Sequence, residues 1–399
     1  MWHTTWSTIG QTSKSYVSLS CTVVELPRRS PHGLQQQLVP GKVLGRRCCR
    51  LGARFRGSVL VEIERQAGSG VALVELSDHG EALHSWSYDE VLAWAEVVAM
   101  KLRVVAKSDF PLIALLLDRS ALTVVAILAV WKAGFAYTPV PKDVPAARQR
   151  RLCSQADGLL TDRAELLDRH QASLLLDRMP IDGPRLMGHS PVPEDICMVI
   201  YTSGSTGAPK GVVCHHRCLW HSVSCFADDI EATSSSRLLW KTPYQWRTAE
   251  YELFGSLCFG GRLYVAPEGA QRHFGLLGQI CSRWHIDAFT AVPSVLPLLE
   301  LSVKHVALVG EALPMDLARR HLQTMQLRNY YGLTETAMTT WKCRDVPKQV
   351  APVGRPQEGS KVQLVKGEVH FGGIMSSGYL KQPELTQERY VQAWGEAFE

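Results

Sequence analysis

The sequence has no apolar run of the roughly 18 residues that a membrane-spanning helix needs. Its longest candidate, residues 122–130, is followed by Trp131 and Lys132 and is typical of a buried helix. With 46% hydrophobic and 20% charged residues, the composition excludes a disordered or collagen-like chain. The length of 399 residues predicts two to three domains. We therefore expect a soluble, cytoplasmic protein with no membrane span.

Cys-x-x-Cys pairs are absent and the eleven cysteines are odd in number, which predicts free buried thiols and no disulfide framework. Cys214, Cys218, His221 and Cys225 recur at helical spacing and resemble a zinc set. On one helix, however, the outer two would lie about 16 Å apart, too far to share an ion. We favour a buried stripe that packs on a sheet. A metal shared by the first three residues and a ligand from elsewhere is the alternative.

A basic surface of the kind that binds nucleic acid is absent from most of the chain. Residues 1–56 hold nine Lys or Arg and one acidic residue, Glu25, whereas the remainder holds 34 basic and 37 acidic residues. No nucleic-acid partner is therefore expected. Residues 1–56 form a basic leader that we expect to be poorly ordered. It has the composition of an organelle transit peptide, but a mis-joined coding exon would look the same.

Apolar patterning from residue 57 onward predicts an α/β fold. Residues 57–76 suit one or two edge strands, and residues 90–102 carry apolar side chains at helical spacing. An apolar run at 111–117, a helix at 120–133 and another apolar run at 135–140 follow in order. Strand, helix and strand in this order indicate a right-handed crossover between parallel strands.

A Pro-rich stretch at 177–195 divides the chain into two expected subdomains, residues 57–185 and residues 186–399. Beyond this stretch, strands alternate with helices. Short antiparallel strands are expected near the end, at 361–365, 367–371 and 378–380.

The most informative stretch is Thr202-Ser-Gly-Ser-Thr-Gly-Ala-Pro-Lys-Gly, which follows an apolar strand and is expected to precede a helix. Its glycines let the backbone turn N–H groups towards a ligand, and its hydroxyl groups and Lys210 add donors and a positive charge. Such a set suits a triphosphate. It is not the Walker pattern, because residue 209 is proline where that pattern needs glycine. A polar turn without a ligand is the alternative interpretation.

This loop resembles the signature loop of adenylate-forming enzymes, a superfamily of acyl-CoA ligases, luciferases and the adenylation domains of nonribosomal peptide synthetases. Other stretches that resemble its motifs occur in the right order: Trp131-Lys-Ala-Gly-Phe-Ala-Tyr-Thr-Pro, Gly310-Glu-Ala-Leu-Pro, Asn329-Tyr-Tyr-Gly-Leu-Thr-Glu-Thr, and Gly367-Glu-Val-His-Phe-Gly-Gly followed by Gly378-Tyr-Leu. The resemblance covers about residues 57–399 and fits the peptide-synthetase branch best. It implies two mostly parallel sheets with flanking helices in a layered core, plus a small distorted β-barrel.

The resemblance also implies a function. A member would use ATP and Mg²⁺ to activate a small carboxylic acid as an acyl adenylate, release pyrophosphate, and pass the acyl group to the phosphopantetheine thiol of a carrier protein. An acyl-CoA ligase and an inactive nucleotide-binding remnant are the alternatives. The family continues past Glu399 with a mobile lid that holds an aspartate, a hinge and a lysine. We therefore expect the large N-terminal core with its C-terminal lid missing.

By the same resemblance, three sets of residues would bind nucleotide and metal. The phosphates would be held by Thr202, Ser203, Gly204, Ser205, Thr206, Gly207 and Lys210. Adenine would contact Gly310, Glu311, Ala312, Asn329, Tyr331 and Gly332, with the tyrosine stacked on its ring. Thr334 would contact the α-phosphate and Glu335 would bind magnesium, so the expected catalytic residues are Lys210, Thr334 and Glu335.

One departure from the family concerns the substrate. Amino-acid-activating members carry an aspartate for the substrate ammonium, and the register set by Glu252 places Arg247 there. A cation about 4 Å from an ammonium costs roughly 4 kcal/mol at an effective dielectric of about 20, so Arg247 predicts a keto, hydroxy or dicarboxylic acid. Alternatively, Arg247 points away and Glu250 serves the amine, or the pocket has decayed. The other expected pocket residues are Thr248, Tyr251, Thr290, Ala307, Val309, Tyr330, Met338 and Thr339.

Overall fold

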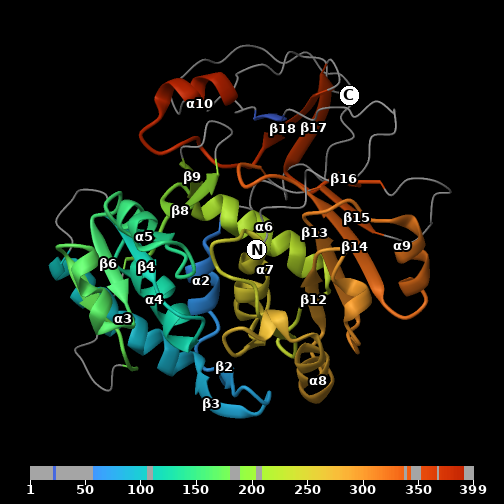
Figure 1. Cartoon of the computed structure of the whole chain (residues 1–399), viewed down its shortest axis with the longest axis horizontal. Coiled ribbons are helices and arrows are strands. Elements are labelled where there is room, and N and C mark those ends of the chain that lie inside the picture. The colour runs from blue at the N-terminus through green and yellow to red at the C-terminus, as the bar shows by residue number, and fades with distance from the viewer. Residues whose placement is uncertain are drawn as a thin grey trace, which may run out of the picture.

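The computed structural model contains three β-sheets with helices packed around them (Figure 1). It describes residues 21–23, 57–105, 111–179, 189–203, 209–336, 339–342, 352–365 and 368–390. Helices α6 (His216–Asp229) and α7 (Thr248–Phe254) lie between the two larger sheets, and the third sheet lies above them in this view. The predicted α/β class, with two mostly parallel sheets, is confirmed.

The six-stranded sheet contains the predicted crossover unit. Strands β4 (Leu112–Leu116) and β5 (Ala136–Pro139) pair in parallel, and helix α4 (Ala121–Lys132) connects them. The strand order is β7-β6-β4-β5-β8-β9, with β6 at Gly158–Thr161, β7 at Ser173–Leu175, β8 at Ile196–Ser203 and β9 at Pro209–His215. Strand β9 runs antiparallel to β8, whereas the other neighbours are parallel.

The nine-stranded sheet is parallel in its centre and antiparallel at both edges. Its order is β16 (Arg355–Pro356), β15 (Thr339–Lys342), β14 (Gln326–Tyr331), β13 (His305–Val309), β12 (Ala288–Ala291), β10 (Arg237–Trp240), β11 (Arg262–Val265), β2 (Val71–Leu76) and β3 (Ala82–Ser87). The carboxyl ends of its parallel strands therefore meet at one edge, where α/β proteins commonly bind ligands.

The third sheet consists of β1 (Cys21–Val23), β18 (Glu368–Gly373) and β17 (Ser360–Val365), in this order. Strands β17 and β18 are antiparallel, as predicted. Within the described residues these strands form an open sheet, and the expected β-barrel is not formed. Strand β1 is the one part of the predicted leader that the structure describes.

The remaining helices cover the sheets. They are α2 (Val59–Glu64), α3 (Tyr88–Val105), α5 (Ala146–Cys153), α8 (Phe274–Trp284), α9 (Met315–His321) and α10 (Pro383–Arg389), with 3-10 turns η1 (Ala164–Arg169), η2 (Leu257–Phe259), η3 (Ala270–Arg272) and η4 (Leu296–Leu298). In the described ranges, every helix is too short or too polar to cross a membrane.

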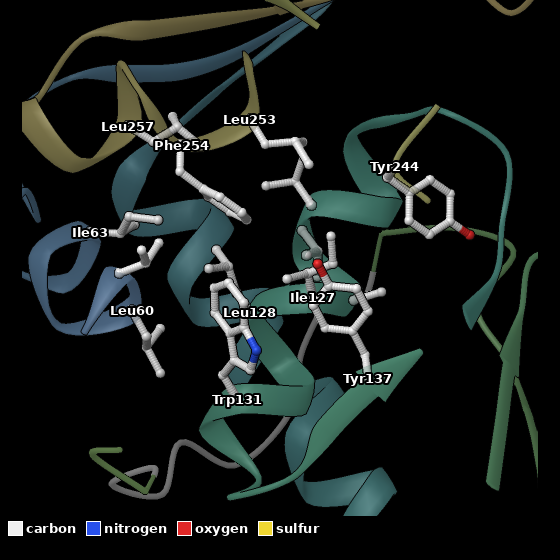
Figure 2. Packing of buried hydrophobic residues seen from close by; sticks show 14 of the residues in the cluster. Leu60, Ile63, Ile127, Leu128, Trp131, Tyr137, Tyr244, Leu253, Phe254 and Leu257 are labelled. Carbon is white, nitrogen blue, oxygen red and sulfur yellow. The ribbon is translucent and has the colours of Figure 1, made fainter. Parts of the chain in front are cut away.

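Apolar side chains from distant parts of the chain pack into one core between the larger sheets (Figure 2). Trp131 of α4 lies with its ring centroid 5.3 Å from that of Phe254 in α7. The Trp131 indole N–H also donates to the carbonyl oxygen of Cys197 at 2.9 Å. Because buried aromatic residues contribute most to such packing, this contact holds α4, α7 and β8 in fixed relative positions.

The prediction of edge strands over residues 57–76 was wrong in the first half, and in the second half it was right about the strand but not about its edge position. The first half forms helix α2, because Val59, Leu60 and Ile63 share one helical face and are all buried. The second half forms β2, which lies inside the sheet between β11 and β3 and not at its edge.

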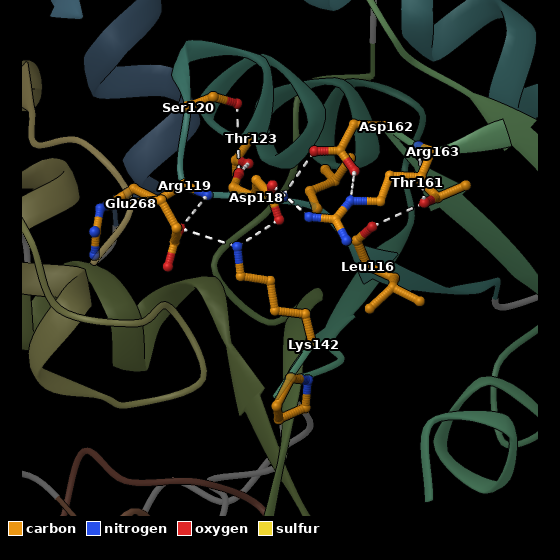
Figure 3. A network of polar contacts seen from close by, with 12 residues as sticks. Leu116, Asp118, Arg119, Ser120, Thr123, Lys142, Thr161, Asp162, Arg163 and Glu268 are labelled. Carbon is orange, nitrogen blue, oxygen red and sulfur yellow. Dashed lines mark hydrogen bonds and ion pairs between the residues drawn. The ribbon is translucent and has the colours of Figure 1, made fainter. Parts of the chain in front are cut away.

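A polar cluster at the carboxyl end of β4 joins the two larger sheets (Figure 3). The buried Arg119 guanidinium donates to the carbonyl oxygen of Lys241, which follows β10 in the other sheet. Next to it, Asp118 accepts hydrogen bonds from Lys142 at 2.7 Å and from Arg163 at 2.6 Å. Burial would raise the pKa of Asp118, but these two hydrogen bonds lower it, so the carboxylate stays ionised at neutral pH.

His216, the first residue of α6, couples folding to pH. Its ring is buried against Trp131, with centroids 5.2 Å apart, and its Nδ1 lies 3.0 Å from the Ser58 hydroxyl. Burial lowers the pKa of His216 from 6.5 to about 3, so the unfolded chain binds a proton that the folded protein does not. Stability from this group is complete above the unfolded pKa and falls as the pH falls below it.

We expect the His216→Gln variant to lose less stability on acidification than the unsubstituted chain. Between about pH 6.5 and pH 5 the difference should reach about 2 kcal/mol, because each pH unit contributes about 1.4 kcal/mol. Urea denaturation at both pH values measures it. The matched control is His79→Gln, which changes an exposed histidine. Equal pH dependence in the two variants would contradict the prediction.

Candidate active site

The predicted phosphate loop connects two paired antiparallel strands. Strands β8 and β9 flank it, with Thr202 opposite Lys210, and both of these side chains are half-buried. The prediction that a helix directly follows the loop was wrong, because β9 comes first and α6 begins at His216. The buried β-branched residues Val212 and Val213 favour this strand and pair with β8. Residues 204–207 and the side chain of Ser203 lie outside the described part of the structure.

Glu335 lies in the turn that follows β14, at the carboxyl edge of the nine-stranded sheet. Ser376 donates two hydrogen bonds to the Glu335 carbonyl oxygen, from its backbone N–H at 3.1 Å and from its hydroxyl at 2.8 Å. The Tyr379 hydroxyl donates to Glu335 Oε1 at 2.9 Å. Both the backbone and the carboxylate of Glu335 are therefore held in place.

Lys210 and Glu335 come together at Tyr379. The Lys210 Nζ lies 5.5 Å from the centre of the Tyr379 ring, whose hydroxyl bonds to Glu335. The structure thus brings the expected phosphate-binding cation and the expected metal ligand to one aromatic side chain. Sequence reasoning missed this role of Tyr379, because Gly378-Tyr-Leu was interpreted as a strand and as a structural motif of the family, with no part in the site. That motif was the available signal.

The residues expected to contact adenine follow β13 or lie at the end of β14 and directly after it, and these two strands are adjacent and parallel. Gly310 has a φ of +91°, a conformation that favours glycine. The exposed Glu311 carboxylate accepts hydrogen bonds from the backbone N–H and the hydroxyl of Ser294, both at 2.9 Å, and this fixes the loop. Ala312 is exposed beside it.

Asn329 offers a buried acceptor at the same edge. Its Nδ2 donates to the Pro352 carbonyl oxygen at 3.0 Å, while its Oδ1 accepts no hydrogen bond from any described residue. A buried acceptor without a donor is costly, so such an atom is suited to a ligand donor. Tyr331 is half-buried nearby, with its ring centroid 6.0 Å from that of Phe371.

Arg247, at the start of α7, is surrounded by polar partners. Its Nε lies 2.9 Å from Glu250 Oε1, and its Nη2 donates to the Ser222 hydroxyl at 3.0 Å. Its Nη1 donates to the Thr334 carbonyl oxygen at 3.0 Å and to Cys214 Sγ at 3.2 Å. The guanidinium therefore connects α7 with α6, with β9 and with the turn that holds the expected metal ligand.

Arg247 and Glu250 form a buried ion pair. Burial raises the pKa of Glu250 to about 7, and the Arg247 charge offsets part of this rise. The Glu250 oxygens make no hydrogen bond with described residues, so their contact with Arg247 is purely ionic. None of the interpretations of Arg247 from the sequence expected it to pair with Glu250, whereas the structure pairs them. Its assignment to the substrate pocket stays a prediction.

Two predicted pocket tyrosines, Tyr251 of α7 and Tyr330 of β14, pack close together. Tyr251 stacks on Phe226 with ring centroids 4.8 Å apart, and the Tyr330 ring lies 5.9 Å from that of Tyr251. The Tyr330 hydroxyl donates to Asp229 at 2.7 Å. Both tyrosines are almost fully buried, so packing fixes their side chains.

The other predicted pocket residues are buried to different degrees. Thr290 and Ala307 are buried partners on adjacent strands, and the Thr290 hydroxyl donates to Glu252, which also pairs with Lys241 at 2.8 Å. Thr248 and Val309 are half-buried. Thr339 lies opposite Tyr331 in β15, and Met338 lies outside the described residues.

The residues of the expected cysteine stripe are buried and lie on two different elements. Cys214 lies on β9 and not on the expected helix, whereas Cys218, His221 and Cys225 lie on α6. The Cys218 thiol donates to the Met375 carbonyl oxygen. Burial raises the pKa of Cys214 to about 12, which keeps the thiol protonated. Across the described ranges, no group of three or more His, Cys, Asp or Glu is placed to hold a metal ion.

A magnesium ion bound together with nucleotide phosphates needs fewer protein ligands. Such an ion is usually held by one or two carboxylates and by phosphate oxygens. Glu335 offers a half-buried carboxylate whose Oε1 is held by Tyr379, and no described residue donates to its Oε2. The residues present therefore fit this ion.

The chain belongs to the AMP-binding enzyme family, which matches residues 63–373. It is 31% identical over 339 residues to tyrocidine synthase 3 of Brevibacillus parabrevis, covering 77% of this chain and 5% of that protein. It is 26% identical over 347 residues to zwittermicin A synthase ZmaJ of Bacillus cereus, covering 77% of this chain and 66% of that one. The chain thus spans only part of the length of these relatives.

The fold is that of adenylation domains in solved nonribosomal peptide synthetases. It matches FmoA3 in an AMPPNP-bound form with a TM-score of 0.75 at 23% identity, covering 84% of this chain and 40% of that one. It also matches a four-domain synthetase bound to AMP and glycine with a TM-score of 0.71 at 24% identity, covering 84% and 26%.

We expect the Glu250→Gln variant to lose about 3–5 kcal/mol of unfolding free energy at a pH near 8, because it leaves the buried Arg247 charge unpaired. Adding Arg247→Met should restore most of this loss. Urea denaturation of the single and double variants measures the coupling. Glu231→Gln breaks an exposed ion pair with Lys304 and should cost far less, because water screens this pair. Additive losses in the double variant would contradict the prediction.

Proposed function

We propose that this chain binds ATP with Mg²⁺ and converts a carboxylic acid into an acyl adenylate, with release of pyrophosphate. The observation that carries the proposal is the convergence of Lys210 and Glu335 on Tyr379. A phosphate-binding cation and a metal-binding carboxylate at one place suit a bound nucleotide triphosphate. Membership of the AMP-binding family supports the same assignment.

The nucleotide would lie along the carboxyl edge of the nine-stranded sheet. An adenine amino group would supply the donor that Asn329 Oδ1 lacks, and Tyr331 would stack on the ring. Lys210 and Thr202 would hold the outer phosphates together with the rest of the phosphate loop. The Thr334 hydroxyl would contact the α-phosphate.

The chemistry needs positioning and charge neutralisation, and no protein nucleophile. A substrate carboxylate oxygen forms a bond to the α-phosphorus while the bond to the bridging oxygen breaks, and pyrophosphate leaves with that electron pair. Magnesium would neutralise charge that builds on the phosphates. Lys210 offsets the same charge, and the fixed Glu335 carboxylate keeps the reacting groups in line.

The substrate class follows from the Arg247–Glu250 pair. Because the pair is formally neutral and the guanidinium already has four partners, we propose an acid with a keto or hydroxyl group where amino-acid-activating relatives bind an ammonium. A second carboxylate would have to displace these partners, so a dicarboxylic acid fits less well. The acceptor we propose is a carrier-protein phosphopantetheine, since the relatives are peptide synthetases. CoA as the acceptor, or nucleotide binding without turnover, are the competing functions.

We expect Lys210→Met to weaken ATP binding at least about tenfold, since a hydrogen bond between charged groups contributes about 1.5–3 kcal/mol. Glu335→Gln should remove most of the Mg²⁺ dependence of ATP binding. Isothermal titration calorimetry with and without Mg²⁺ measures both effects. Lys304→Met changes an exposed lysine and is the control. If ATP affinity is unchanged in both site variants, the nucleotide-site assignment fails.

A panel of acids tests the substrate class. With MgATP present, we expect a keto or hydroxy acid to raise the melting temperature more than the α-amino acid with the same side chain. The reason is that the neutral ion pair supplies no net negative charge for an ammonium. Thermal unfolding of matched acid pairs measures the preference. A larger shift with the amino acid would show that Arg247 does not set the substrate class.

A further inference from the structure

Residues 376–380 act as a third strand on the hairpin that carries the phosphate loop. The Ser377 N–H donates to the Val213 carbonyl oxygen at 3.0 Å, and the Val213 N–H donates to the Gly378 carbonyl oxygen at 3.0 Å. The Leu380 N–H donates to the Gly211 carbonyl oxygen at 2.8 Å, next to Lys210. An antiparallel bridge between residues 212 and 379 lies between these bonds. This segment therefore moves with β9.

The same five residues also hold the turn at Glu335. Ser376 donates twice to the Glu335 carbonyl oxygen, and the Tyr379 hydroxyl donates to its carboxylate. One short segment is thus bonded to the hairpin of the six-stranded sheet and to the turn of the nine-stranded sheet. The length of this segment therefore sets the distance between the hairpin and the turn.

Tyr379 is itself held in one orientation. Its backbone N–H donates to the Thr386 hydroxyl at 3.0 Å, and its ring meets that of Tyr390 edge-on at 5.7 Å. Gly378 precedes it with a φ of +129°, and a Cβ there would lie only 2.4 Å from Thr386 Cγ2. The backbone therefore admits only glycine before Tyr379 without rearrangement.

We propose that Tyr379 is a positioning residue that sets the Glu335 carboxylate for magnesium and Lys210 for the nucleotide phosphates, so that residues 376–380 couple the two halves of the site. The inference rests on the proposed function. In this proposal the hydroxyl and the ring of Tyr379 have separate roles. The hydroxyl orients Glu335 Oε1 and leaves Oε2 for the ion, and the ring attracts the Lys210 ammonium.

Because the two roles use different atoms, two substitutions separate them. Tyr379→Phe removes the hydroxyl and keeps the ring, whereas Tyr379→Leu removes both. Partners that orient a metal-binding carboxylate typically change metal affinity by about tenfold or more. A cation–ring contact at a partly exposed site corresponds to about a threefold change in affinity. A merely structural tyrosine would lower stability without altering the Mg²⁺ requirement.

The experiment titrates ATP into the full chain by calorimetry over a series of Mg²⁺ concentrations and in a chelator. For Tyr379→Phe we expect the Mg²⁺ concentration that gives half of the maximal increase in ATP affinity to rise about tenfold. The ATP affinity without metal should be unchanged. For Tyr379→Leu we expect the same rise and about threefold weaker metal-free binding. The control is Tyr244→Phe, which removes a buried hydroxyl bonded to the Leu115 carbonyl oxygen at 2.9 Å. It should leave both quantities unchanged.

Two results would overturn the proposal: a Mg²⁺ requirement in Tyr379→Phe equal to that of the unsubstituted chain, or an equal rise in Tyr244→Phe. Thermal unfolding of each variant checks that it is folded, and Tyr379→Phe decides the question if Tyr379→Leu does not fold. If the unsubstituted chain fails to bind MgATP, the proposed function itself is wrong. Binding by the unsubstituted chain with no change in Tyr379→Phe refutes the positioning role alone.

Discussion

Three donors converge on the turn from Thr334 to Glu335, and the arrangement of the site depends on them. Arg247 donates to the carbonyl oxygen of Thr334, Ser376 donates to that of Glu335, and Tyr379 donates to the Glu335 carboxylate. A carbonyl group turned away from water needs a donor, and none of these donors comes from the sheet that carries the turn. The turn can therefore keep this shape only when α7 and residues 376–380 are in place.

Helix α7 places two buried carboxylates within one short element. Glu250 pairs with Arg247, and Glu252 pairs with Lys241 at the end of β10. Dehydrating such pairs offsets most of their attraction, so they add little net stability, but losing one partner is costly. Their effect is to fix how α7 is placed relative to the segments that it contacts. Under the proposed function they also make this part of the substrate pocket formally neutral.

The proposed nucleotide site is divided between two sheets, and the core between them supports it. Lys210 belongs to the six-stranded sheet and Glu335 to the turn of the nine-stranded one. The contact of Trp131 with Phe254 and the hydrogen bond from Arg119 to Lys241 hold the two sheets in fixed relative positions. A shift of about 1 Å between catalytic groups can slow a reaction about a hundredfold, so packing far from the nucleotide contributes to the site.

Much of the fold and part of the site could be predicted because the signals are local. Apolar runs and helical spacing are read over a few residues, and they gave β4, α4 and β5 correctly. The same local reasoning failed at α2, where a strand pattern was assumed, and after the phosphate loop, where β9 replaces the expected helix. In both places, packing against elements that are distant in the sequence decided whether the segment forms a helix or a strand, and this packing cannot be read from the local sequence.

The sequence by itself determined which side chains are candidates to bind phosphate, adenine and metal, because residue type and order along the chain are enough to recognise the motifs. Only the tertiary structure decided which of them share a partner. The meeting of Lys210 with Glu335 at Tyr379, and the pairing of Arg247 with Glu250 beneath the Thr334 carbonyl, join segments that are far apart in the chain. Such contacts depend on how the sheets pack, and no local pattern encodes the distance between two strands of different sheets.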